Sequence, residues 1–439
     1  MTPPTRDAGQ GVLPASVRAE VEAMLAGTDE YLARAYPGPD ASRQPVHTVY
    51  VPADRYRAGL AREWGQQALS ALEDAGGIEA FLESIGISAP GRAALAERVA
   101  TKLAVEPVED LRIDFEDGYT GHGSAEDQTA LDAARGLRAE MESGQATPFV
   151  GIRFKSLERD TRERGLRTLD LFLTTLARSG PLPAGLELTL PKVKTPAQVA
   201  AMARVCAALE GALALPTGRL RFEVQVETPQ AILAADGTAA VAQMVHAGSG
   251  RVSALHYGTY DYSASLGIAA RYQSMEHRVA DHAKAVMQLA AADTGVRLSD
   301  GSTNILPVGD REQIQHGWAV HARLVRRSLE HGYYQGWDLH PGQLPSRFAA
   351  TYAFYREGLA EAAGRLGAYL SGGQGAVLDE PATARALAWF LRRGLDCGAV
   401  EATELHQQAG LVPEDLTEVL GAAGGANGSR RRGHSQGAP

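Results

Sequence analysis

Two acidic residues each follow an apolar stretch that is typical of a β-strand. Glu227 follows Phe222-Glu-Val-Gln-Val, and Asp261 follows Ser253-Ala-Leu-His-Tyr-Gly-Thr-Tyr. Carboxylate oxygens are the hard ligands that Mg²⁺ or Mn²⁺ prefers. Reactive groups of parallel α/β proteins collect at the carboxyl ends of the strands. We therefore interpret Glu227 and Asp261 as direct ligands of Mg²⁺ (or Mn²⁺), with simple ion pairing or helix capping as the alternative.

A second acidic group, Asp114, Glu116 and Asp117, ends another predicted strand. Like charges this close repel each other unless a cation or an arginine neutralises them. Arg153 ends the next predicted strand, and its planar guanidinium suits bidentate binding of a carboxylate. Two interpretations stay open for Arg153: it binds a substrate carboxylate, or it pairs with the acidic group.

Two further side chains could contribute charge or a proton. Lys192 lies near the end of the fourth predicted strand. It is either a supporting charge that binds substrate or a member of a plain salt bridge. His340 precedes Pro341 and could act as an acid or base, but a buried, hydrogen-bonded structural histidine is the favoured interpretation.

The elements that must position these side chains alternate regularly along the chain. Apolar and β-branched runs predict strands, and apolar residues at helical spacing predict helices. Eight strand-then-helix units in succession favour parallel strands with right-handed crossovers, which close into a (β/α)8 TIM barrel. The predicted strands are residues 47–51, 111–117, 147–155, 186–193, 222–227, 253–261, 304–308 and 336–340, and the helices include 17–35, 230–247, 274–294, 382–393 and 404–420.

The segment boundaries follow from this pattern. We predict an N-terminal extension over residues 1–44, a barrel over 45–368, a C-terminal helical lid over 369–420 and a disordered tail over 421–439. Residues 56–110 form a helical insertion after the first strand, far longer than an ordinary connection. An insertion at this place leaves the barrel on its active-site face and could cover the site.

Composition excludes several classes of protein. The 439 residues carry a formal net charge of −9, which argues against nucleic-acid binding. No apolar run approaches the length of a membrane span, and no signal peptide is evident. Two cysteines offer neither a disulfide framework nor a cysteine-based zinc site. We expect a cytoplasmic protein.

Seven short motifs, in order along the chain, resemble those of one enzyme family. They are Val49-Tyr-Val-Pro-Ala-Asp54, Ile113-Asp-Phe-Glu-Asp117, Gly151-Ile-Arg153, Leu190-Pro-Lys-Val193, Val226-Glu-Thr228, Gly258-Thr-Tyr-Asp-Tyr-Ser-Ala-Ser-Leu-Gly267 and Gly336-Trp-Asp-Leu-His-Pro-Gly-Gln343. This set resembles the HpcH/HpaI aldolase and citrate lyase β-subunit-like family, with malyl-CoA lyase and malate synthase as relatives.

The resemblance implies roles for individual residues. Glu227 and Asp261 would hold Mg²⁺, Glu116 and Asp117 would orient metal-bound waters or Arg153, and Arg153 would bind the substrate. Leu378-Asp-Glu-Pro381 resembles the lid motif whose aspartate is a general base, often delivered from a neighbouring subunit. Asp379 is then the catalytic base, with a helix N-cap as the alternative. The resemblance also implies a homo-oligomer, a trimer or hexamer.

The implied activity is a metal-dependent carbon–carbon lyase or aldolase acting on a 2-keto or 2-hydroxy acid, with an acyl-CoA as candidate partner. The arginine that many members place before the first motif has no counterpart, because Val46 and His47 occupy that region. Three alternatives therefore stay open. They are a CoA-independent pyruvate–aldehyde aldolase, phosphoryl chemistry on a phosphoenolpyruvate-like substrate, and an inactive barrel that serves as a binding module.

Overall fold

The computed structural model describes residues 12–39, 42–88, 91–372 and 380–421 of the chain. Its centre is a sheet of eight strands, all parallel, in the order β7-β6-β5-β4-β3-β2-β1-β8. β1 pairs with both β2 and β8, and the single bridge Ser299–Gln335 joins β7 to the start of β8. The predicted (β/α)8 barrel is confirmed. Its strands are β1 His47–Pro52, β2 Asp110–Asp114, β3 Phe149–Arg153, β4 Gly185–Leu190, β5 Phe222–Val226, β6 Val252–Tyr257, β7 Arg297–Ser299 and β8 Gly336–Asp338.

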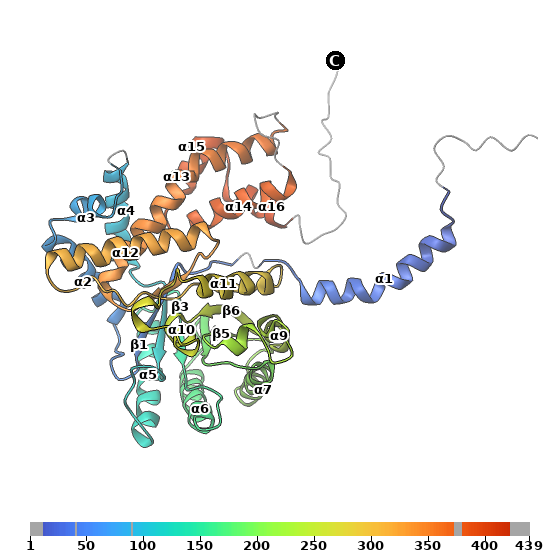
Figure 1. Cartoon of the computed structure of the whole chain (residues 1–439), viewed down its shortest axis with the longest axis horizontal. Coiled ribbons are helices and arrows are strands. Elements are labelled where there is room, and N and C mark those ends of the chain that lie inside the picture. Colours follow the sequence, from blue (N-terminus) through green and yellow to red (C-terminus); the bar gives the residue numbers. More distant parts are fainter. Residues whose placement is uncertain (1–11, 40–41, 89–90, 373–379, 422–439) are drawn as a thin grey trace, which may run out of the picture.

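Helices surround the strands because each presents one apolar face to them (Figure 1). In α6 (Arg162–Arg178), for example, Leu169, Phe172, Leu173 and Leu176 recur at helical spacing and are all buried. The other helices from β2 to α13 are α5 Ser124–Glu142, α7 Pro196–Ala212, α8 Pro229–Ile232, α9 Ala240–Ala247, α10 Thr259–Ser265, α11 Arg278–Ala291, α12 Arg311–Glu330 and α13 Leu344–Leu370. Short 3-10 turns lie at Ala270–Tyr272 and Pro341–Gln343.

Three helices lie between β1 and β2, and three more follow α13. The first group is α2 Leu60–Asp74, α3 Ile78–Ser84 and α4 Arg92–Val105, and the second is α14 Pro381–Asp396, α15 Ala402–Ala409 and α16 Pro413–Gly421. The long helix α13 connects the two groups, since it contacts α2 and α4 on one side and α14 and α15 on the other. The helices of residues 60–105 thus pack against the C-terminal part of the chain.

Four sequence-based expectations need correction. The seventh strand is Arg297–Ser299, whereas residues 304–308 form no strand. Asp261 does not close a strand but lies in the first turn of α10. The helix expected over 230–247 is broken into α8 and α9 by a turn at Gly237, and that over 404–420 is broken into α15 and α16 by Gly410 and Pro413. Both Gly237 and Gly410 have positive φ, which a continuing helix does not allow.

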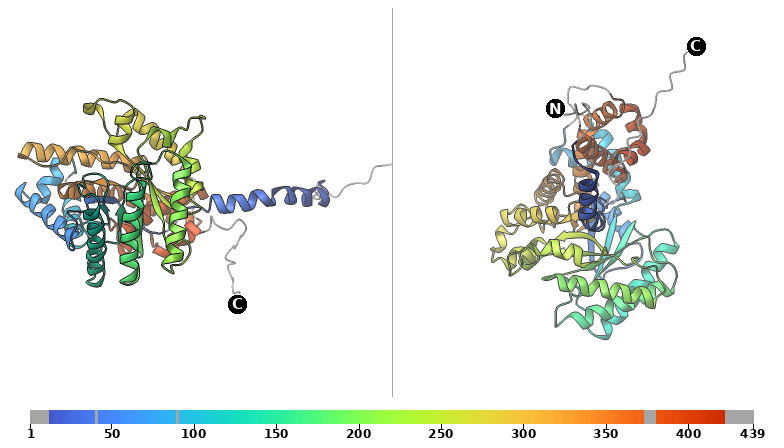
Figure 2. Two further views of the ribbon diagram at one scale, coloured as in Figure 1. Left: turned by 90° about the horizontal axis from the view of Figure 1, so that it is seen from below. Right: turned by 90° about the vertical axis from the view of Figure 1, so that its right-hand side faces the viewer.

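Helix α1 (Ala15–Ala35) differs from all of these because it extends away from the body of the molecule (Figures 1 and 2). None of its residues is buried. Its attachment is short: the Tyr36 ring meets the His246 ring edge-on at 5.5 Å between centroids, and the Gly38 N–H donates to the Asp293 carbonyl at 2.8 Å. Within the described residues, no helix combines the length and apolarity needed to cross a bilayer.

The barrel interior contains a buried charged network around Arg112. Its guanidinium pairs with Asp110, meets Glu223 Oε2 at 2.7 Å and donates to Thr189 Oγ1 at 3.0 Å. Since β2 and β5 are not neighbours in the sheet, the Arg112–Glu223 pair spans the interior. His256 Nε2 lies 3.1 Å from Glu223, and burial lowers the pKa of His256 to about 4, so its ring is neutral near pH 7.

Gly151 leaves no room for a side chain between β3 and β4. A Cβ at this position would lie 1.6 Å from the carbonyl oxygen of Glu187 on β4. We expect Gly151→Ala to reduce the free energy of unfolding by about 3 kcal/mol or more, because backbone must move to admit the methyl group. Urea denaturation measures the change. Gly211→Ala is the matched control, since a Cβ there meets no atom within 4 Å. Equal stability of Gly151→Ala and wild type would contradict this packing.

Candidate active site

The structure brings six of the seven predicted site residues together at the carboxyl ends of the strands. Lys192 Nζ lies 2.8 Å from Asp261 Oδ2, 3.1 Å from Glu116 Oε1 and 3.7 Å from Asp117 Oδ1. Its backbone N–H donates to Glu227 Oε1 at 2.6 Å. Arg153 Nη1 completes the group, 3.2 Å from Asp117 Oδ2 and 3.5 Å from Glu116 Oε2. We call Glu116, Asp117, Arg153, Lys192, Glu227 and Asp261 the acidic site. Asp379, the seventh, lies outside the described residues.

Local backbone geometry fixes Glu227. Lys192 has a φ of 52°, a left-handed conformation that is uncommon for a residue with a side chain. This conformation accompanies the turn in which the Lys192 amide reaches the Glu227 carboxylate. On the other side, a Cβ at residue 258 would lie 2.5 Å from Glu227 Cβ, so the turn after β6 requires glycine here. Burial raises the pKa of Glu227 to about 7, with Asp261 adding to the rise.

The pKa values of Glu116 and Asp117 are shifted in opposite directions. Burial, together with the charges of Asp117 and Glu227, raises the pKa of Glu116 to about 8 against the opposing effect of Arg153 and Lys192. Its Oε2 accepts no hydrogen bond from the described residues. Burial would also raise the pKa of Asp117, but Arg153 and Lys192 outweigh it, so this pKa is lowered. The acidic site therefore combines carboxyl groups whose pKa values are raised, Glu116 and Glu227, with one whose pKa is lowered, Asp117.

Arg153 is held in place by contacts with Asp114, Tyr50 and Gln225. Its Nε and Nη2 donate to the two oxygens of Asp114 at 2.7 and 2.5 Å, in a bidentate pair. The guanidinium lies over the Tyr50 ring at 4.8 Å, and its Nη1 donates to Gln225 Oε1 at 3.4 Å. Of the two interpretations, the ion pair with the acidic group is the one present in this structure. Binding of a substrate carboxylate by Arg153 stays a prediction, and Nη1 is the donor that faces the other acids.

Sequence reasoning left several supporting residues unassigned. Asp114 was grouped with its acidic neighbours but given no role, and Tyr50, Gln225 and Trp337 were not singled out. Tyr50 O–H donates to Glu223 at 3.0 Å, and the Tyr50 and Trp337 rings pack at 4.6 Å between centroids. Side chains alternate between the two faces of a strand, so Tyr50 and Thr48 lie on the same face of the first strand. This alternation was the signal from which a role for Tyr50 could have been predicted. His340 Nδ1 accepts the Gly342 N–H at 3.0 Å, as expected of a structural histidine, but the residue is half-buried and not buried as that interpretation expected.

The donor chemistry of the acidic site fits a divalent cation. In the described part of the chain, no three His, Cys, Asp or Glu side chains are arranged to hold a metal. Mg²⁺, however, commonly binds to one or two carboxylates and keeps several waters. Glu116 Oε2 accepts no hydrogen bond from the described residues, and burial raises the pKa values of Glu116 and Glu227, so a bound cation would stabilise their ionised forms. Direct ligation by Glu227 and Asp261 stays a prediction, and in this structure Asp261 pairs with Lys192 at 2.8 Å.

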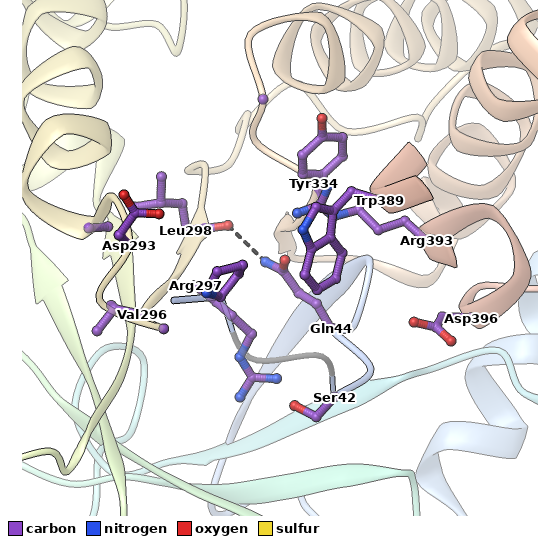
Figure 3. Close-up of a pocket in the computed structure, with 14 residues that line it drawn as sticks. Ser42, Gln44, Asp293, Val296, Arg297, Leu298, Tyr334, Trp389, Arg393 and Asp396 are labelled. Carbon is purple, nitrogen blue, oxygen red and sulfur yellow. Dashed lines mark hydrogen bonds between the residues drawn. The ribbon is translucent and has the colours of Figure 1, made fainter. Parts of the chain in front are cut away.

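A separate cavity of about 180 Å³ lies at the opposite end of the barrel (Figure 3). Arg297, at the start of β7, and Gln44, before β1, line one side. Trp389 and Arg393 of α14 line the other, and Gln44 Nε2 donates to the Leu298 carbonyl at 3.0 Å. None of the six residues of the acidic site lines this cavity.

Residues 25–422 match the model of a family described as a domain of unknown function, DUF6986. The chain belongs to this family. No curated protein sequence matches the DUF6986 chain.

Several solved structures are similar to this DUF6986 protein. A citrate lyase from Burkholderia xenovorans LB400 has a TM-score of 0.56 and 20% identity, with 87% of this chain and 99% of that chain covered. A Haloferax volcanii malate synthase complex with magnesium and glyoxylate has a TM-score of 0.48 and 12% identity, with 86% and 97% covered. The CitE protein of Mycobacterium tuberculosis, in complex with magnesium, acetoacetate and coenzyme A, has a TM-score of 0.46 and 18% identity, with 81% and 100% covered. The Burkholderia citrate lyase, whose TM-score is above 0.5, confirms the resemblance for the fold.

Proposed function

We propose that this DUF6986 protein is a Mg²⁺-dependent carbon–carbon lyase or aldolase that acts on a 2-keto or 2-hydroxy acid. The observation that carries the proposal is the acidic site itself, where four carboxylates and two cations meet at the carboxyl ends of the strands. The motifs shared with citrate lyase-like proteins and the fold of the Burkholderia citrate lyase support the same class of reaction.

The residues of the site divide into ion-binding and substrate-binding groups. Glu227 and Asp261 would hold Mg²⁺, and the ion would polarise the C2 oxygen of the substrate. Arg153 Nη1 and Lys192 Nζ supply the positive charge that a substrate carboxylate needs. Glu116 and Asp117 would orient waters and keep both cations in place, since they contact Arg153 and Lys192 directly.

Cleavage of a 2-hydroxy acid needs a base that removes the hydroxyl proton. The adjacent carbon–carbon bond then breaks, and its electron pair forms the enolate of the leaving fragment, which takes up a proton. Asp379 is the base that the lid motif predicts, and this role stays a prediction from sequence. Delivery of Asp379 from a neighbouring subunit, and the trimer or hexamer that the family resemblance implies, are proposals of the same kind.

A CoA-independent aldolase is the second candidate, and one observation favours it. His47 stands near the place of the arginine that many citrate lyase-like proteins carry. It is fully buried, and its Nδ1 lies 2.8 Å from Asp338 Oδ2. His47, the first residue of β1, is therefore out of reach of an acyl-CoA bound at the carboxyl ends of the strands. The substrate would then be pyruvate or a similar keto acid with an aldehyde.

Ligand-dependent thermal stability tests the proposal, because a ligand that binds the native state raises its melting temperature. We expect Mg²⁺ with pyruvate, glyoxylate or oxaloacetate to raise the midpoint, and the rise to disappear in Asp261→Asn. Asp132→Asn, an exposed acid on α5, is the matched control. A further rise in melting temperature with acetyl-CoA would favour the thioester reaction. The absence of that rise would favour the aldolase. No shift with any keto acid would contradict the proposed function.

A further inference from the structure

Helix α1 carries a stripe of mostly apolar side chains, of which Tyr31 meets the ring of Tyr36, just beyond the helix, at 6.3 Å between centroids. Its members are Val17, Val21, Met24, Thr28, Tyr31 and Ala35, spaced alternately four and three residues apart. Leu25 and Leu32 widen the stripe on one side. None of the helix is buried, and Met24 is 73% exposed. Helices in proteins owe most of their stability to packing of an apolar face. We therefore expect this face of α1 to pack against a partner.

We propose that α1 packs antiparallel against α1 of a second copy of this chain, about a two-fold axis that passes close to Ala26. Spacing of 3.5 residues is the period of a two-helix seam. In this register the stripe is complementary to itself. Val17 lies opposite Ala35, Val21 opposite Tyr31, and Met24 opposite Thr28, and the two-fold axis repeats each layer.

Charge complementarity selects the antiparallel arrangement. Glu20, Gly27 and Arg34 flank the seam on one side at seven-residue spacing. Antiparallel pairing sets Glu20 opposite Arg34 of the second copy, twice by symmetry, and Gly27 opposite its own counterpart. On the other flank, Leu25 meets its counterpart. A parallel pair would set Glu20 opposite Leu25 and form no charge pair, so it lacks the feature that fixes register.

The position of α1 on the molecule permits this pairing. The helix leaves the body at Tyr36 and projects clear of the barrel and of the C-terminal helices (Figures 1 and 2). Its 21 residues span about 30 Å. Antiparallel pairing therefore places the two bodies at opposite ends of the helix pair, where they do not collide. The inference does not depend on the proposed enzymatic function.

Molar mass of the full chain tests the pairing, measured by light scattering after size exclusion and by sedimentation velocity. We expect an assembly with an even number of copies, and we expect Val21→Asp/Met24→Asp to halve its mass. Because neither residue is buried, the melting temperature of the body should not change. Glu22→Lys, beside the stripe but outside it, is the control and should keep the wild-type mass. A monomeric or odd-numbered full chain, or a wild-type mass in the double variant, would overturn the proposal.

A charge exchange tests the direction of the helices. Glu20→Arg places a positive charge opposite Arg34 of the other copy, twice by symmetry. The repulsion should weaken association roughly tenfold. Glu20→Arg/Arg34→Glu reverses both partners and should restore wild-type association. Failure of the second change to restore it, or no effect of the first, would overturn the antiparallel register. Glu20 and Arg34 do not contribute to the acidic site. Keto-acid binding by these variants can therefore be measured independently of their association.

Discussion

Glu227→Gln is expected to lower lyase activity at saturating Mg²⁺ by at least about 10²-fold, because it removes one of two anionic ligands of an ion whose charge stabilisation is worth several kcal/mol. The Mg²⁺-dependent rise in melting temperature should be lost with it. The side chain is 2% exposed and glutamine has nearly the same shape, so the fold should be retained. Activity with keto acid and aldehyde or acyl-CoA partners, together with calorimetric Mg²⁺ titration, measures both effects.

The same variant should be more stable than wild type at alkaline pH when no divalent cation is added. Burial raises the pKa of Glu227 from 4.5 to about 7. Between these values the folded chain binds more protons than the unfolded chain, so stability falls as pH rises from about 4.5 to 7. The loss is on the order of 3 kcal/mol and stays constant above that range. Glutamine has no proton to lose, and parallel pH profiles for variant and wild type would contradict the buried carboxylate.

Arg112→Met is expected to reduce the free energy of unfolding by about 3–5 kcal/mol, the usual cost of leaving a buried charge without its partner. Arg112 is 1% exposed, and its removal leaves Asp110 and Glu223 facing each other in the barrel interior. Guanidinium chloride denaturation at pH 7 gives the change. Activity should fall only in proportion to the folded fraction, since Arg112 does not contact the acidic site.

Two comparisons separate loss of charge pairing from loss of packing. Arg112→Met/Asp110→Asn/Glu223→Gln removes all three charges and should recover most of the lost stability. Arg135→Met breaks an exposed pair with Asp132 at 3.0 Å and should change stability by less than about 1 kcal/mol. If Arg112→Met cost no more than Arg135→Met, the interior network would not contribute as the structure indicates.

Sequence periodicity was sufficient for the fold where strands are long and apolar. β5 and β6 were predicted within a few residues, because five or six consecutive buried positions give a strong signal. β7 was misplaced because it has only three residues, Arg297–Ser299, of which two are partly exposed. Positive φ at Asp293 and Gly295 turns the chain sharply after α11, and such turns leave little trace in an apolar pattern.

The acidic site could be predicted as a group but not in its contacts. Parallel strands bring their carboxyl ends together, so Glu227, Lys192 and Glu116 had to be near one another. The carboxylate that Arg153 binds depends on side-chain rotamers, which the sequence does not give. Arg153 pairs with Asp114 because the two residues are direct neighbours in the β2–β3 register. The left-handed backbone of Lys192 gave no signal, since lysine has no preference for it.

The pairing of β1 with β8 has a consequence for synthesis of the chain. His47 pairs with Gly336, so one edge of β1 gains its partner only after most of the chain has been made. At the usual rates of translation this interval is roughly 15–60 s. During that time the nascent barrel exposes a strand edge with free N–H and C=O groups, which other chains can bind. Molecular chaperones that shield nascent chains would therefore act on this protein mainly before residue 336 leaves the ribosome.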